Sequence, residues 1–165
     1  MTSPDDAATV DPSQLDVGLL ASFVGYAAQD VVLADLAEAG FGDLRVAHGF
    51  IVQHLLGGAR TVTELAELQS VSVQAISKTT SELIALGYVA STVDPDDGRS
   101  RRLSLTERGH ASVAASRAAR RRVQRRVSRR LGADRVTALS ADLVSVLDLL
   151  GAVDAVSQRR VRRPS

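Results

Sequence analysis

Apolar residues near both ends of the chain recur at alternating intervals of three and four positions. This heptad spacing predicts two helices, each with an apolar seam along one side. The first seam comprises Val17, Leu20, Val24, Ala27, Val31 and Ala34, and the second comprises Val136, Leu139, Leu143, Val146, Leu150 and Val153. Leu19, Phe23 and Tyr26 lie outside the first seam, so this helix is apolar on more than one side and needs more than one packing partner.

The two seams together predict a helical interface between two copies of the chain. A short chain with a seam-bearing helix at each end is suited to a composite dimer interface. An ordinary bundle within one chain is the alternative, because periodicity alone does not distinguish the two. The predicted interface residues are Val17, Leu20, Val24, Val136, Leu139, Leu143, Val146 and Leu150.

Between the seams the pattern changes to short helices with clear start and stop signals. Thr61 and Glu64 have the spacing of a capping box, which begins a short helix through Leu68. Ser72 caps the next helix, which Gly87 ends. The side chains of this second helix that we expect to point inward are Ile76, Thr80 and Leu83.

A β-hairpin is predicted after these helices. Residues 88–93 are rich in β-branched side chains, residues 94–98 form a turn, and Leu103 and Leu105 alternate on a returning strand. Thr106 then caps a long arginine-rich helix. The predicted fold is therefore mainly α with a small β-hairpin wing. It is a winged helix-turn-helix with N- and C-terminal dimerisation helices.

These elements divide the chain into five predicted regions. The N-terminal residues are small and polar, and the last eight include four arginines, so we expect disorder at both ends. The regions are a disordered N-terminal arm over 1–12, an N-terminal dimerisation helix over 13–40, a winged helix-turn-helix lobe over 41–109, the arginine-rich helix and C-terminal dimerisation helix over 110–157, and a basic disordered tail over 158–165.

The second helix of the helix-turn-helix carries the chemistry expected of a DNA recognition helix. Its outer face is short, polar and mildly basic, and consists of Gln74, Ala75, Ser77, Lys78 and Ser81. Glutamine can form two hydrogen bonds with adenine, and small side chains allow close approach to base edges. A solvated helix face without a ligand is the alternative interpretation.

The predicted wing brings three arginines to its tip and returning strand, Arg99, Arg101 and Arg102. An arginine there can enter a narrow minor groove or neutralise phosphates. The alternative is that Asp94, Asp96 and Asp97 hold these arginines in surface ion pairs. Both can apply together, since an acid can orient the arginine that reaches DNA.

Several short motifs occur through the lobe and into the next helix: Leu65-Ala66, Val71-Ser72, Gly87-Tyr88-Val89, Asp94-Pro95-Asp96-Asp97-Gly98-Arg99 and Leu105-Thr106-Glu107-Arg108-Gly109. Together they resemble the motifs of the MarR family of transcriptional regulators. The resemblance implies a homodimer, a pseudo-palindromic operator, and release by small anionic or phenolic effectors. It also implies that Arg99 enters the minor groove. One departure is the pair Gln69-Ser70, which stands where the family usually has a glycine.

The residues and the resemblance together predict a DNA-binding surface. Its members are Thr61, Thr63, Ser72, Gln74, Ala75, Ser77, Lys78, Arg99, Arg101 and Arg102. We therefore expect a sequence-specific transcriptional regulator that acts as a repressor on double-stranded DNA. A winged-helix module that binds a protein, and a non-specific DNA-binding protein with the same fold, are the alternatives.

Charge is distributed unevenly along a chain whose formal net charge is only +1. Residues 1–40 contain seven acidic residues and no lysine or arginine, whereas residues 110–165 contain thirteen arginines and four aspartates. The arginine-rich helix is therefore expected to pair chiefly with the acidic N-terminal helix of its own or a partner chain. Direct contact of this helix with DNA is the alternative.

Composition bears on cysteine chemistry and on the location of the protein in the cell. The 165 residues include no cysteine, which excludes disulfides, thiolate metal sites and thiol nucleophiles. The N-terminus lacks the pattern of a signal peptide, and the apolar stretch 17–28 is shorter than the about 20 residues that span a bilayer. We therefore expect a cytoplasmic protein without a membrane partner.

The resemblance predicts an effector site, whereas residue spacing indicates neither a metal site nor an enzyme. By analogy with the family, an effector pocket is expected between the dimerisation helices and the DNA-binding lobe, lined by Phe23, Tyr26, Arg45, His48 and Phe50. Ordinary core-edge packing of these residues is the alternative. The histidines have no metal-ligand spacing, and no phosphate loop or nucleophile elbow is present, so we expect neither a metal, nor a cofactor, nor an enzyme.

Overall fold

The computed structural model describes residues 10–95 and 97–157. The predicted tail, 158–165, and residues 1–9 of the predicted arm lie outside these described residues. The elements are η1 (Pro12–Gln14), α1 (Val17–Leu36), the π-helical turn η2 (Ala37–Phe41), α2 (Val46–Leu55), α3 (Val62–Gln69), α4 (Val73–Ala85), β1 (Val89–Val93), β2 (Arg101–Leu105), α5 (Glu107–Leu131), α6 (Ala133–Leu149) and α7 (Val153–Ser157).

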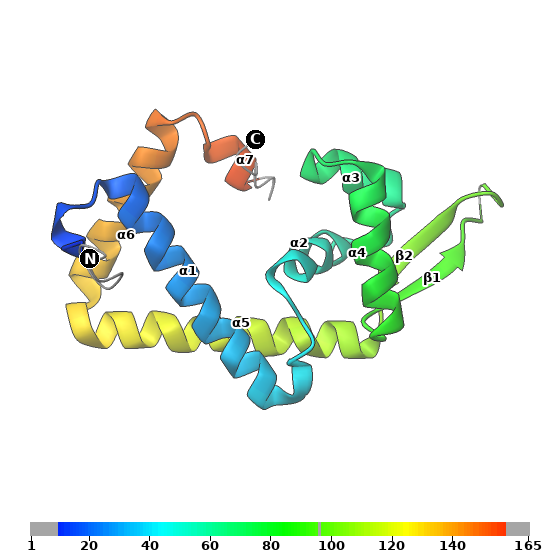
Figure 1. Ribbon diagram of the computed structural model, residues 1–165, viewed down its shortest axis with the longest axis horizontal. Helices are drawn as coiled ribbons and strands as arrows, with labels where there is room; N and C mark the ends of the chain where they lie inside the picture. Colours follow the sequence, from blue (N-terminus) through cyan, green and yellow to red (C-terminus); the bar gives the residue numbers. More distant parts are fainter. Residues whose placement is uncertain (1–9, 96, 158–165) are drawn as a thin grey trace, which may run out of the picture.

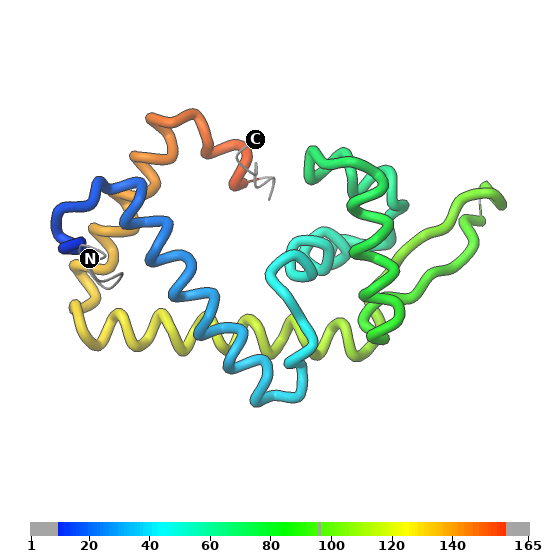
Figure 2. The backbone as a smooth tube through the Cα atoms, in the orientation of Figure 1, coloured from blue at the N-terminus to red at the C-terminus, as the bar shows by residue number. Residues whose placement is uncertain are grey.

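The long helix α5 connects two parts of the molecule (Figure 1). At its N-terminal end lie α2, α3, α4 and the hairpin, α1 crosses it near its middle, and α6 follows at its C-terminal end. The backbone trace shows α1 crossing α5 before the chain turns back into α2 (Figure 2). The predicted mainly helical fold with one antiparallel hairpin is confirmed.

The predicted helix starts are present as hydrogen-bonded caps. Thr61 Oγ1 accepts from the backbone N–H of Glu64 at 3.2 Å, and Glu64 Oε2 accepts from the N–H of Thr61 at 2.6 Å, which completes the capping box. Ser72 Oγ accepts from the N–H of Ala75 at 3.2 Å and caps α4. Thr106 Oγ1 accepts from the N–H of Gly109 at 3.1 Å and caps α5.

The turn between α3 and α4 is made without glycine. Ser70 takes the left-handed conformation, with φ 53° and ψ 43°, and is the only non-glycine residue with positive φ among those described. A left-handed residue with a Cβ costs about 1–2 kcal/mol. Hydrogen bonds on both sides of it, from Ser70 N to Glu67 O and from Val71 N to Ala66 O, each 3.1 Å, hold the turn in place.

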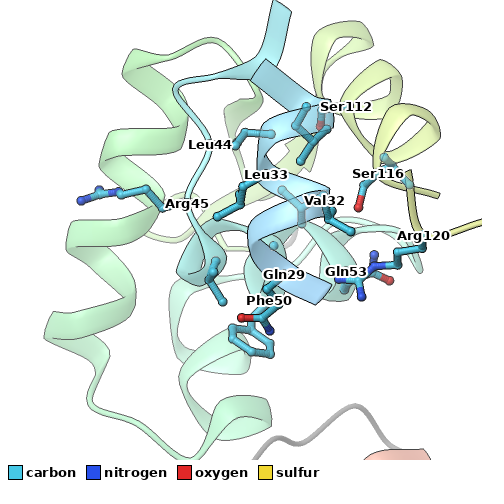
Figure 3. Close-up of a pocket in the computed structure, with 15 residues that line it drawn as sticks. Gln29, Val32, Leu33, Leu44, Arg45, Phe50, Gln53, Ser112, Ser116 and Arg120 are labelled. Atoms are coloured by element: carbon cyan, nitrogen blue, oxygen red, sulfur yellow. The ribbon is translucent and has the colours of Figure 1, made fainter. Parts of the chain in front are cut away.

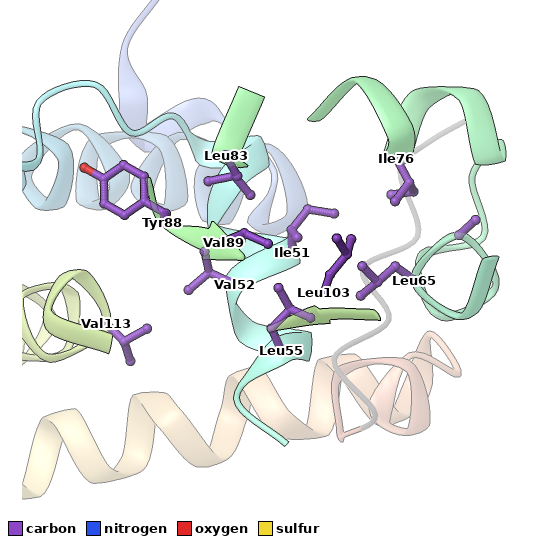
Figure 4. Packing of buried hydrophobic residues seen from close by; sticks show 11 residues of the cluster. Ile51, Val52, Leu55, Leu65, Ile76, Leu83, Tyr88, Val89, Leu103 and Val113 are labelled. Carbon is purple, nitrogen blue, oxygen red and sulfur yellow. The ribbon is translucent and has the colours of Figure 1, made fainter. Parts of the chain in front are cut away.

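The core of the winged-helix lobe lies between α2, α3, α4, the hairpin and the start of α5 (Figure 4). The side chains predicted to point inward from α4 are all buried, and the Thr80 hydroxyl donates to Ile76 O at 2.9 Å. The hairpin is tied to the chain before α3, because Arg60 and Leu103 exchange backbone hydrogen bonds of 3.0 and 2.8 Å. This core therefore fixes the positions of α4 and the hairpin relative to each other.

Helices α1 and α5 pack through a smaller core of Val32, Leu36 and Ala119. Beside it, Arg122 donates from Nε to Asp35 Oδ2 at 2.8 Å. The predicted pairing between the acidic N-terminal helix and the arginine-rich helix is thus present at this position within one chain.

Helix α1 exposes most of its apolar surface. The segment Val17–Phe41 is long and apolar enough to cross a membrane by length and composition, and only 6% of its most apolar window is buried. The expectation that this region is too short is wrong, because the helix continues past Ala28 through Gln29 and Asp30. A core helix of a single chain would be largely covered, so this surface lacks a partner within the part of the chain that the structure describes.

Most predicted interface residues are uncovered in the single chain. The exposed ones are Val17, Leu20, Val24, Leu139, Leu143 and Leu150, and Val146 is half-buried. Val136 departs from the prediction, since it is buried within its own chain at the start of α6. It therefore supports the fold of α6 rather than offering a surface to a second copy.

Candidate nucleic-acid interface

The helix-turn-helix presents the N-terminal half of α4 to solvent. Leu65 and Ala66 of α3 are buried, as is Ile76 on the inner side of α4. The predicted contact residues of α4 are all exposed, namely Ser72, Gln74, Ala75, Ser77 and Lys78. Because N-terminal residues of a recognition helix contact base edges, this surface has the placement that groove binding requires.

The two threonines at the start of α3 differ in their availability. Thr63 is exposed, whereas Thr61 is half-buried and its hydroxyl oxygen accepts the capping hydrogen bond from Glu64. The capping role explains the presence of Thr61 without any contact to DNA. Thr63 is therefore the better placed of the two for a phosphate.

The three wing arginines are held differently. Arg101 donates from Nε to Ser91 Oγ at 2.8 Å, and Arg102 donates from Nε to Asp94 Oδ2 at 3.0 Å. Arg99 uses its backbone N–H on Asp97 Oδ1, at 3.0 Å, and its guanidinium has no partner among the described residues. The predicted aspartate pairing is thus present for Arg102, Arg101 bonds only to neutral oxygens of Ser91, and Arg99 is the wing arginine whose guanidinium has no hydrogen-bond partner among the described residues.

A cluster of Arg45, His48 and Glu82 connects α2 to α4. Arg45 forms an ion pair with Glu82 Oε2, and His48 Nε2 lies 3.3 Å from the same oxygen. The Arg45 backbone N–H donates to His48 Nδ1 at 3.2 Å, which assigns the ring proton to Nε2. The hydrogen bond from His48, together with the charge of Arg45, lowers the pKa of Glu82. The cluster thus holds the C-terminal half of α4 against the start of α2.

A second cluster, Asp43, Tyr88 and Arg108, joins the loop before α2 to the hairpin and to α5. The Tyr88 hydroxyl donates to Asp43 Oδ1, and Arg108 donates to Asp43 Oδ2 at 3.1 Å and to the Tyr88 oxygen at 3.0 Å. The Arg108 guanidinium also lies 4.6 Å from the centre of the Tyr88 ring. The hydrogen bond from Tyr88 lowers the pKa of Asp43, and burial raises the pKa of Tyr88.

Gly109 explains how α5 comes so close to this cluster. A Cβ at this position would lie 2.3 Å from the backbone oxygen of Tyr88. Only glycine permits this contact without a backbone shift. The close approach fixes the start of α5 against β1, next to Arg108.

Replacing Tyr88 by phenylalanine should lower the free energy of unfolding by about 1–2 kcal/mol, because Asp43 and Arg108 lose a shared hydrogen-bond partner. The loss should be fully present above the ordinary pKa of Asp43. It should shrink as the pH falls through that residue's lowered pKa, since a protonated Asp43 no longer gains from the bond. Urea unfolding at several pH values measures both effects.

The matched control is Tyr26→Phe, because Tyr26 is the other tyrosine of the chain and is exposed on α1. It should leave the free energy of unfolding unchanged. An equal loss in both variants, or a loss in Tyr88→Phe that does not vary with pH, would contradict the role given to the Asp43 contact.

A cavity of about 140 Å³ lies between α1, α2 and α5 (Figure 3). Of the five residues predicted for an effector pocket, Arg45 and Phe50 line this cavity, whereas Phe23, Tyr26 and His48 do not. Phe23 and Tyr26 are exposed nearer the N-terminus of α1. His48 is buried on the side of α2 that faces Glu82. Polar residues of the lining that the sequence did not indicate are Gln29, Gln53, Ser112, Ser116 and Arg120.

The cavity is largely apolar and its lining includes two arginines, although the Arg45 guanidinium points away from the other lining residues (Figure 3). Val32, Leu33 and Leu36 supply apolar surface from α1, while Arg45 precedes α2 and Arg120 belongs to α5. This combination suits a small ligand with an apolar body and a negative group. Within the described ranges, no group of three or more His, Asp or Glu side chains is placed to hold a metal ion.

The fold and these exposed groups define a winged helix-turn-helix protein. The sequence model of the MarR family matches residues 43–100. The structure of apo MarR from E. coli is 22% identical, with a TM-score of 0.65, and covers 81% of this chain and 97% of its own. YusO from Bacillus subtilis is 21% identical, with a TM-score of 0.67, and covers 85% and 98%. No curated protein sequence matches the chain.

A third similar structure is a mutant of MepR from S. aureus bound to an oligodeoxyribonucleotide. It is 16% identical, with a TM-score of 0.60, and covers 83% of this chain and 99% of its own. The family match over the lobe and the shared fold over most of the chain agree with each other. The winged-helix lobe thus matches the MarR family model over residues 43–100, and the chain has the fold of the MarR and YusO structures.

Proposed function

We propose that this protein is a cytoplasmic repressor that binds a pseudo-palindromic operator sequence-specifically as a homodimer. The observation that carries the proposal is the pairing of two exposed features on one lobe: the polar N-terminal half of α4, and Arg99 on the wing, whose guanidinium has no partner among the described residues. The first suits base edges in a major groove, and the second suits the adjacent minor groove or its phosphates. The similar MepR structure, bound to an oligodeoxyribonucleotide, supports the same use of the fold.

The homodimer follows from apolar surface that one chain leaves uncovered. Val17 and Val24 on α1 are each 62% exposed, and Leu139, Leu143 and Leu150 on α6 and just beyond it are also exposed. An apolar surface of this extent is typical of an interface. Two-fold symmetry would place two α4 helices on half-sites about one helical turn, roughly 10 base pairs, apart.

Release by a small anionic or aromatic effector is the further part of the proposal. Arg45 lines the cavity and also forms an ion pair with Glu82 on α4. A negative ligand that draws Arg45 into the cavity would weaken this brace. The ligand would shift α4 away from its DNA-bound position only if it binds the shifted conformation more tightly than the DNA-bound conformation.

Selection of bound genomic fragments with the purified protein tests the proposal, followed by gel shifts with a scrambled competitor. We expect fragments that share a two-fold symmetric sequence. Equal affinity for selected and scrambled DNA would favour the non-specific DNA-binding alternative. No binding to any DNA would favour the protein-interaction module.

Replacing Gln74 by alanine should cost about 1–3 kcal/mol of operator affinity and relax the base preference at one position per half-site. The reason is that Gln74 is exposed in the first turn of α4 and supplies the amide that pairs with adenine. Repeating the fragment selection with this variant measures the change in preference. An unchanged preference would exclude Gln74 from base recognition.

A further inference from the structure

Val73 is an unexpected residue at the start of the recognition helix. It is the first residue of α4, directly after the cap Ser72, and 50% of its surface is exposed. Valine is a poor helix former, so the position gains nothing from helix propensity. The buried residues of α4 are Ile76, Thr80 and Leu83, so Val73 is not part of the core of the lobe.

The helical spacing places Val73 on the same face as the polar contact residues. Positions 73, 74, 77 and 78 lie on neighbouring ridges of one helix face, because residues three and four apart are neighbours on a helix surface. Val73 is the only branched aliphatic side chain on this face in the first two turns, beside Gln74, Ser77 and Lys78. The face therefore combines an amide, a hydroxyl and an ammonium group with one pair of methyl groups.

We propose that Val73 determines specificity by packing against the C5-methyl group of a thymine in the major groove. This inference rests on the proposed function. The thymine methyl is the apolar group that base edges present in the major groove, and small apolar side chains contact it. Gln74 is the adjacent residue and carries the amide suited to adenine, so the two side chains together favour an A·T step in each half-site.

Deoxyuridine substitution in the selected operator tests this contact, because uracil lacks only the methyl group of thymine. We expect wild-type protein to lose affinity at one thymine per half-site. The loss should be about fourfold for one half-site, the value of one buried methyl group, and about fifteenfold for both. Fluorescence anisotropy titrations with the paired operators measure it.

Val73→Ser should bind the thymine and uracil operators equally, since serine is tolerated at a helix N-terminus and lacks the methyl groups. Val73→Ile keeps the aliphatic contact and should keep the discrimination. The matched control is Ile84→Thr, which changes a partly exposed aliphatic residue near the C-terminal end of the same helix. This variant should discriminate as wild type does.

The outcomes separate the inference from the function on which it rests. A wild-type protein that prefers its operator but tolerates uracil at every thymine overturns the role of Val73 and leaves the proposed function standing. Discrimination that persists unchanged in Val73→Ser assigns the methyl contact to another residue and also overturns it. A wild-type protein with no sequence preference at all overturns both.

Discussion

Arg99→Ala lowers operator affinity by about 2 kcal/mol or more per dimer, which is a loss of at least about thirtyfold. Each of the two wings loses a guanidinium that no described residue neutralises, and a hydrogen bond to a charged group contributes about 1.5–3 kcal/mol. The slope of log affinity against log salt should also fall by about two, one for each lost phosphate contact. Titrations of operator binding at several salt concentrations measure both quantities.

Arg125→Ala is the matched control for Arg99→Ala. Arg125 is an exposed arginine of α5, and no described acidic residue pairs with it. The two variants remove the same charge, so they share any effect of net charge on DNA affinity. If Arg125→Ala reduces affinity and salt slope as much as Arg99→Ala does, the wing has no special role and the arginine-rich helix contacts DNA.

If the proposed homodimer forms, we expect Leu143→Glu to convert it to a monomer and to lower operator affinity by at least a hundredfold, roughly the contribution of a second half-site. Leu143 lies in the second apolar seam and is exposed in the single chain, so glutamate there disturbs no core of the described chain. In a dimer the same glutamate would be buried against apolar side chains, which is costly for a charge. Analytical ultracentrifugation reports the oligomeric state, and circular dichroism verifies that the helices are retained.

Ser145→Glu is the control for the dimer prediction. Ser145 lies two positions farther along α6, outside the seam, and is exposed. The Ser145→Glu variant should remain a dimer with unchanged operator affinity. A dimeric Leu143→Glu variant would place the interface elsewhere, and a monomeric Ser145→Glu variant would show that the interface is wider than the seam.

Most local features of the fold were predictable because neighbouring residues encode them. The capping box of Thr61 and Glu64 and the caps Ser72 and Thr106 depend on side chains that reach backbone groups three positions away. The inward side of α4 followed from helical spacing in the same way. Signals of this range are visible in the sequence without knowledge of the tertiary fold.

The two clusters that brace the lobe were not predictable as clusters. Asp43 and Tyr88 are 45 positions apart, and Arg45 and Glu82 are 37 apart. No periodicity connects such residues, because their contact depends on how α2, α4 and the hairpin pack. The effector-pocket prediction failed in part for the same reason: Phe23 and Tyr26 share α1 with the cavity-lining Gln29, but lie on an uncovered stretch of it.

By itself, the sequence determined the caps that begin α3, α4 and α5, which side of α4 is buried, and the resemblance of the lobe to MarR-family proteins. Tertiary structure alone decided which polar side chains form hydrogen bonds within the chain. It engages Arg101, Arg102 and the Thr61 hydroxyl within the chain, buries Val136, and leaves Arg99 and Val73 uncovered. The physical reason is that hydrogen bonds and burial depend on distances between segments remote in sequence, whereas helix and turn formation depends on neighbours along the chain.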